Sequence, residues 1–109
     1  MGGREKRERI AEEIKKVVDE VYKNAETGIK WVRKGVEKCS MWDLSVGLGD
    51  VSESFGYVIA LEKLCNKLGI EIPEETKKKM REIKGMHFTA YRLRDKFQSV
   101  CTCTIRKQS

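Results

Sequence analysis

The chain has 109 residues, which is enough for one domain and too few for two. Its hydrophobic fraction of 39% can build a core, whereas one proline and an aromatic fraction of 7% argue against a turn-rich β-sandwich or barrel. The sequence has no apolar run long enough to span a membrane, and its start, MGGREKRER, does not resemble a secretory signal, so we expect a cytoplasmic protein without a membrane partner.

The excess positive charge lies in the last third of the chain. The net charge is +6, from 23 basic and 17 acidic residues. Residues 74–109 carry ten basic and four acidic residues, so their surplus equals that of the whole chain. Localised positive charge attracts polyanions more strongly than the same charge spread over a surface. A solvated, lysine-rich helical surface would have the same composition, so both interpretations stay open.

The amide composition points to a hot environment. Asn and Gln together number only four, while Lys and Glu are abundant. Few thermolabile amides and many ion-pair formers are typical of proteins from thermophiles. We therefore expect a thermophilic source, archaeal or an archaeal virus. Intracellular disulfides are frequent in hyperthermophiles, so the four cysteines need not all be reduced.

The first predicted helix covers about residues 4–38. From Ile10 to Cys39 apolar residues recur at helical spacing and fall on one arc roughly 140° wide. Gly28 and Gly35 each weaken this helix by roughly 1 kcal/mol relative to alanine, and a break or kink near either one is an alternative.

The second predicted helix covers about residues 42–68. Ser40 is a suitable N-cap for it, because a serine side chain accepts from the free backbone N–H groups of a first turn. Its apolar residues wrap more widely than those of the first helix, so we expect it to be central and the most buried. Gly47 and Gly49 leave an alternative in which the N-terminal half is a loop and the helix starts at residue 50 or 52.

The third predicted helix covers about residues 74–98. Gly69 is suited to the left-handed position that ends a helix, and Pro73 is suited to the start of the next one. After residue 98 the β-branched residues favour extended structure, so we expect residues 99–109 to form an extended tail. The sequence therefore predicts a single all-α domain over residues 1–109, an antiparallel three-helix bundle with long helices and an extended C-terminal tail.

One face of the third helix is predominantly basic. On an ideal helix six cations fall within roughly 120° of arc, opposite the apolar residues. Phe88 lies within the same arc, where an exposed aromatic ring can stack on an unpaired base, although it can also contact a partner helix. We predict nucleic-acid contact there. The predicted residues are Lys77, Lys78, Arg81, Lys84, Phe88, Arg92 and Lys96, together with Arg106 and Lys107 in the tail.

The lone histidine forms an R-x5-H pair with Arg81. This pair on a late helix resembles the R-x4–6-H motif of the HEPN family of helical ribonucleases. The resemblance covers two positions and the all-α character. It implies a dimer in which Arg81 holds a phosphate while His87 passes a proton as a ribose 2′-hydroxyl attacks. An ideal helix places the two side chains about 120° apart, so a shared cleft requires a bend at Gly85. The alternative is that His87 is a partly buried helix residue.

The cysteines favour a disulfide over a metal site. Cys101 and Cys103 form a C-x-C pair, which is not the C-x2-C of a zinc site. In an up-down-up bundle Cys39 lies at the same end as these two, while Cys65 lies roughly 35 Å away. We predict no metal site, a disulfide between Cys39 and Cys101 or Cys103, and a buried thiol at Cys65. Four reduced thiols remain the alternative.

No other pattern indicates catalysis or a cofactor. The sequence has no phosphate-binding glycine loop and no nucleophile motif, so we expect neither a cofactor nor catalytic residues unless the Arg81 and His87 pair is one. Trp31 falls off the apolar stripe and Trp42 lies near a turn, which favours a partner protein or a homodimer through this region. The leading prediction is a basic helical protein that binds nucleic acid or belongs to a nucleoprotein assembly. The alternatives are the ribonuclease and a protein–protein adaptor with no nucleic-acid role.

Overall fold

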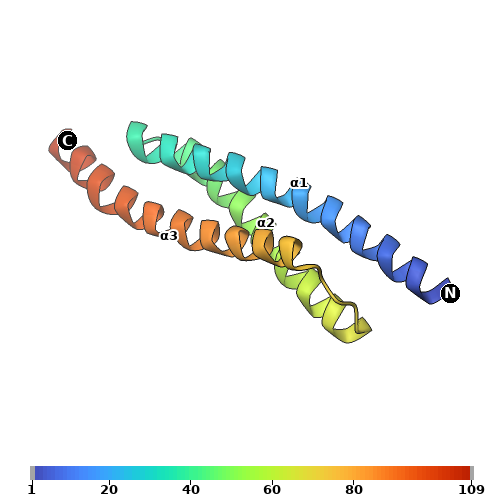
Figure 1. Cartoon of the computed structure of the whole chain (residues 1–109). Coiled ribbons are helices and arrows are strands. Elements are labelled where there is room, and N and C mark those ends of the chain that lie inside the picture. The colour runs from blue at the N-terminus through green and yellow to red at the C-terminus, as the bar shows by residue number, and fades with distance from the viewer. Residues whose placement is uncertain (1, 109) are drawn as a thin grey trace.

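The protein is an elongated bundle of three helices. The structure is a computed structural model that describes residues 2–108, with side chains for residues 3–101. Its helices are α1 (Gly2–Lys38), α2 (Met41–Leu68) and α3 (Glu74–Gln108). They run up, down and up, every pair is in contact, and the bundle measures 70 × 19 × 17 Å (Figure 1). No strand occurs in residues 2–108, so the predicted all-α three-helix bundle is confirmed.

None of these three helices, over the residues described, is both long enough and apolar enough to cross a bilayer.

The α1–α2 turn is short and capped as the sequence predicts. Cys39 has φ 51°, and the hydroxyl of Ser40 accepts a hydrogen bond from the backbone N–H of Asp43 at 3.3 Å. The second helix begins at Met41 and continues without interruption through both glycines in its first half. The alternative of a loop followed by a helix from residue 50 or 52 is therefore wrong.

Glycines bring α1 and α2 into backbone contact. A Cβ atom built on Gly47 would lie 2.5 Å from the carbonyl oxygen of Gly28 and 2.6 Å from the backbone nitrogen of Val32. One built on Gly35 would lie 2.6 Å from the backbone nitrogen of Leu44. Both Gly28 and Gly35 lie in this helix–helix contact. The close packing that they permit offsets their poor helix propensity, so α1 stays continuous across them. The predicted alternative of a break in α1 is wrong.

The α2–α3 turn has the predicted stop and start signals. Gly69 adopts φ 66°, its N–H donates to the Asn66 carbonyl at 3.3 Å, and the N–H of Ile70 donates to the Cys65 carbonyl at 2.9 Å. These two bonds satisfy two of the last four carbonyls of α2. The carbonyl of Pro73 then accepts from the N–H of Lys77 at 2.9 Å and begins α3.

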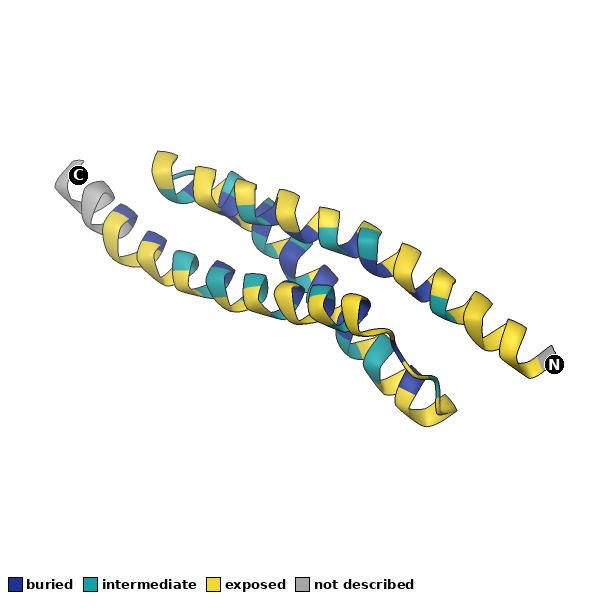
Figure 2. Cartoon of the chain, in the orientation of Figure 1, coloured by how far each residue is buried: buried dark blue, intermediate teal, exposed yellow. Residues whose placement is uncertain are grey.

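The core divides into two clusters along the length of the bundle. Figure 2 shows the buried residues on the sides where the helices face one another, and the first turns of α1 as exposed. The cluster near the α2–α3 turn consists of Ile14, Val18, Val21, Ala25, Val58, Cys65, Ile72, Met80 and Ile83. The cluster at the other end consists of Val32, Leu44, Val51, Ala90, Phe97 and Cys101.

The extended C-terminal tail is not observed. The third helix runs to Gln108, so the predicted helix end at residue 98 and the extended conformation of residues 99–108 are wrong. Phe97 and Cys101 are four residues apart, and both are buried in the second core cluster. Burial of this helical face outweighs the local preference of β-branched residues for extended structure.

A disulfide joins Cys39 to Cys101, with the two Cα atoms 5.4 Å apart. The predicted disulfide is thereby confirmed with Cys101 as the partner, and the side chain of Cys103 lies outside the described part of the chain. Cys65 is a free thiol and is buried, as predicted, and burial raises its pKa. The bond fastens the end of α1 to the last third of α3.

Replacing Gly47 with alanine tests the backbone contact between α1 and α2. We expect Gly47→Ala to lower the free energy of unfolding by about 1–3 kcal/mol, because the added methyl group meets backbone atoms that cannot move independently. Gly49→Ala is the matched control: a Cβ there meets nothing within 4 Å, so better helix propensity should raise stability by up to about 1 kcal/mol. Denaturant titration measures both values, and equal effects would contradict the contact.

Reduction of the disulfide tests its contribution to stability. The bond spans 62 residues of sequence, so loop-closure entropy predicts a loss of roughly 4 kcal/mol in the free energy of unfolding on reduction. Denaturant titration with and without a thiol reductant measures this difference. Cys101→Ser should abolish the effect of the reductant and Cys103→Ser should retain it; the reverse pattern would assign the bond to Cys103.

Candidate nucleic-acid interface

Four cations are exposed on the side of α3 that faces away from the core. Lys78, Arg81, Arg92 and Lys96 are all exposed, whereas Met80, Ile83, Ala90 and Phe97 bury the opposite side of the helix. At 1.5 Å per residue the four cations extend over about 27 Å. None of the ion pairs found among the described side chains includes any of them. We call Lys78, Arg81, Arg92 and Lys96 the basic ridge.

Two other predicted cations are engaged in ion pairs. The Nζ atom of Lys84 lies 2.6 Å from a carboxylate oxygen of Glu62 on α2, and both side chains are about one third exposed. The Nζ atom of Lys77 lies 3.8 Å from Glu74, one turn earlier on α3. Lys77 and Lys84 are half-buried on the side of α3 that faces α2, so they belong to the helix contact more than to the ridge.

A further ion pair, which the sequence analysis missed, fastens the other side of α3. Lys79 donates to the carboxylate of Asp19 on α1 at 2.5 Å, and its Nζ atom lies 5.8 Å from the centre of the Tyr22 ring. The hydrogen bond from Lys79 lowers the pKa of Asp19, and the same bond raises the pKa of Lys79. The pairing depends on the alignment of α1 with α3, and nothing in the local sequence specifies that alignment.

Phe88 lies along the basic ridge, between Arg81 and Arg92. Its side chain is 64% exposed, and its nearest aromatic neighbour is His87, with ring centroids 5.9 Å apart. An exposed phenylalanine side chain leaves a flat apolar surface open to solvent. The ridge therefore combines cations with one aromatic platform.

His87 points toward α2 and packs among aromatic rings. Its imidazole stacks on Phe55 with centroids 4.0 Å apart and lies edge-on to Tyr91 at 4.7 Å. Its Nδ1 atom is buried without a hydrogen-bond partner in the described part of the chain, and burial lowers the pKa of His87. Arg81 is exposed, and α3 is continuous through Gly85. A single chain therefore does not bring the R-x5-H pair together.

The two tryptophans differ in their exposure to solvent. Trp42 is 75% exposed at the start of α2, next to the exposed Met41. Trp31 is half-buried, and the Nζ atom of Lys34 lies 4.9 Å from the centre of its ring. The side chains of Arg106 and Lys107 lie outside the described residues.

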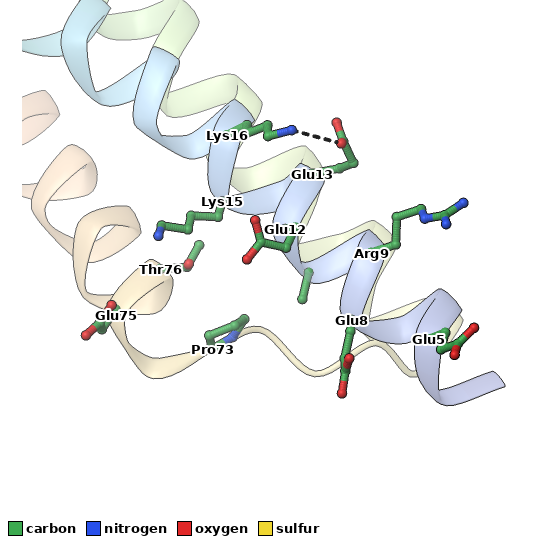
Figure 3. Close-up of a pocket in the computed structure, with 11 residues that line it drawn as sticks. Glu5, Glu8, Arg9, Glu12, Glu13, Lys15, Lys16, Pro73, Glu75 and Thr76 are labelled. Carbon is green, nitrogen blue, oxygen red and sulfur yellow. Dashed lines mark hydrogen bonds and ion pairs between the residues drawn. The ribbon is translucent and has the colours of Figure 1, made fainter. Parts of the chain in front are cut away.

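One surface hollow is lined mostly by charged side chains and does not resemble a small-molecule site. Its lining comes from the first half of α1, the α2–α3 turn and the start of α3, and eight of the eleven residues drawn are charged (Figure 3). Its one ion pair joins Lys16 and Glu13 at 3.4 Å. Ligand pockets are mostly apolar and enclosed. Among the described residues no group of three or more His, Cys, Asp or Glu side chains is placed to hold a metal ion.

No protein-family model, no curated protein and no solved structure matches this chain. The basic ridge is therefore interpreted from its own residues.

The buried histidine predicts a loss of stability in mild acid. Because burial lowers the pKa of His87 below its ordinary value, the unfolded chain binds the proton first as the pH falls. The free energy of unfolding should therefore fall as the pH drops below about 6.5, and this loss should end below the pKa of the folded state. His87 is the only histidine, and His87→Phe, which keeps a ring on Phe55, should remove the dependence. Denaturant titrations between pH 8 and pH 5 measure it, and an unchanged slope in the variant would contradict the assignment.

Proposed function

We propose that this chain is a non-enzymatic binding protein that contacts nucleic acid electrostatically through the basic ridge of α3, alone or as an accessory subunit of a nucleoprotein assembly. The observation that carries the proposal is the placement of four exposed cations and one exposed aromatic ring on the same side of a single helix.

The difference between paired and unpaired cations on α3, among the described side chains, supports this proposal. Lys79 and Lys84 make ion pairs with α1 and α2. The ridge residues make none among the described side chains, so their charge is available to an anion in solution. A polyanion that binds along the ridge releases its condensed counterions, and this release drives association.

The geometry of the ridge suits a phosphate backbone. A nucleic-acid strand presents a negative charge every few ångströms, so a ridge about 27 Å long spans several phosphates. Lysine and arginine contacts to phosphate determine position and affinity and carry no sequence information. The proposal is therefore one of binding without base preference.

Phe88 favours a single strand over a duplex. Stacking of an unpaired base on an aromatic side chain contributes about 1–3 kcal/mol and is possible with any base. In a duplex the bases are already stacked on one another, so Phe88 has no comparable surface to contact. The proposed ligand is therefore single-stranded RNA or DNA.

Salt-dependent binding tests the proposal. Fluorescence anisotropy with labelled single-stranded and duplex oligonucleotides would be measured across a series of salt concentrations. Four phosphate contacts predict a slope of log affinity against log salt of about −3 for single strands. The double variant K78Q/R92Q should reduce the magnitude of this slope by about half and weaken binding. The double variant K30Q/R33Q, which removes the same charge from exposed positions of α1, is the matched control.

Phe88→Ala separates stacking from charge in the same assay. It should weaken single-strand binding by roughly 1–3 kcal/mol and leave the salt slope unchanged. Absence of binding at low salt, or an equal effect of the ridge and control variants, would overturn the proposal and leave a protein–protein adaptor.

A further inference from the structure

A continuous apolar face is exposed where α1 and α2 meet. On α2 the side chains of Tyr57, Leu64 and Leu68 are 52%, 53% and 62% exposed, and on α1 those of Ile10 and Val17 are 40% and 39% exposed. These five make up most of the large hydrophobic side chains exposed among the described residues. With the half-buried Leu61 between the helices, they form what we call the α1–α2 face.

Several members of this face line shared hollows, and the positions of the others follow from their spacing along α2. Ile10, Val17 and Leu61 line one groove between α1 and α2, and Ile10 and Leu68 line a second hollow beside it. Along α2 the apolar positions recur after four, three and four residues, which is the spacing of helices that pack side by side. The face therefore has the pattern of a helix–helix interface, and no helix within residues 2–108 covers it.

The surface area of the chain is large for a monomer. A monomeric protein of 12.6 kDa is expected to expose about 6,200 Å², whereas this chain exposes 7920 Å². A stable interface buries about 800 Å² on each partner, which is well within this surplus. Monomers also rarely expose an apolar patch of more than a few hundred Å². The surplus leaves room for a partner, and the five exposed apolar side chains of the α1–α2 face favour this face as its position.

The charges along α2 indicate that the partner is a second copy in the opposite direction. Glu53 is exposed before the apolar stretch, and Lys63 and Lys67 are exposed within its second half. The remaining carboxylate of that half, Glu62, is paired with Lys84. A parallel copy would place like charges together. An antiparallel copy places the acidic half of α2 against the basic half.

We propose that the chain forms a two-fold symmetric dimer through the α1–α2 face, with the two α2 helices antiparallel. In the register that places Tyr57 against Leu64 of the second copy, Leu61 lies near the two-fold axis and Lys67 lies next to Glu53 of the second copy. Ile10 and Val17 border this contact. Phe55 and Glu62, which face α3, lie on another side of α2, so the basic ridge stays open in the dimer.

Sedimentation analysis of the purified chain tests the dimer. As its concentration is raised to about 100 µM, the wild type should reach twice the mass of the chain. Leu64→Glu should raise the dissociation constant of the dimer at least tenfold. Phe88→Glu also introduces a glutamate in place of an exposed apolar residue, but Phe88 lies off the α1–α2 face. This control variant should remain dimeric. Circular dichroism of both variants checks that the bundle is folded. A monomeric wild type would overturn the proposal, and so would a dimer that Leu64→Glu leaves intact.

Charge reversal tests the orientation of the two copies. Glu53→Lys and Lys67→Glu should each weaken the dimer several-fold, and the double variant E53K/K67E should recover the affinity of the wild type. Failure of the double variant to recover would overturn the antiparallel arrangement. These measurements contain no nucleic acid, so their outcome is independent of the function proposed for α3.

Discussion

The bundle depends on the backbone contact between α1 and α2. Gly28 and Gly47 meet at a separation that leaves no room for a Cβ atom, and Gly35 does the same against Leu44. Because the contacting atoms belong to the backbone, neither helix can slide along the other without a clash. The relative position of α1 and α2 is therefore fixed, and together they present a defined surface to α3.

The apolar side of α3, with Met80, Ile83, Ala90 and Phe97, packs on this surface and sets which side of the helix faces solvent, and three further contacts flank it. Asp19 on α1 pairs with Lys79 on one flank of α3, and Glu62 on α2 pairs with Lys84 on the other flank. The disulfide holds the last third of α3 to the end of α1. Partly exposed ion pairs add little stability. Here they neutralise one lysine on each flank of α3, while the ridge cations on the outer side take part in none of the ion pairs among the described side chains.

The sequence was sufficient where the signals were local or could be placed by chain geometry. The caps at Ser40 and Gly69 and the pairing of Cys39 follow from residue type and helix length, and the structure confirms them. The prediction of an extended tail is wrong because the burial of Cys101 on a helical face outweighs the preference of β-branched residues for extended structure. The roles of Lys79 and Lys84 could not be predicted, because their partners lie on other helices and the alignment of those helices is set by packing.

The position of α2 in the bundle explains why the α1–α2 face and the basic ridge lie on different sides of the molecule. Apolar residues wrap more widely around α2 than around α1, and a wide apolar surface of this kind is normally buried. Two neighbours, α1 and α3, cannot enclose it, so one flank stays exposed beside α1 while the cations of α3 lie elsewhere. If a second copy covers that flank, the dimer carries two basic ridges. A long polyanion that reaches both ridges binds the second one at high effective concentration, so dimerisation strengthens binding even though no new cation is added.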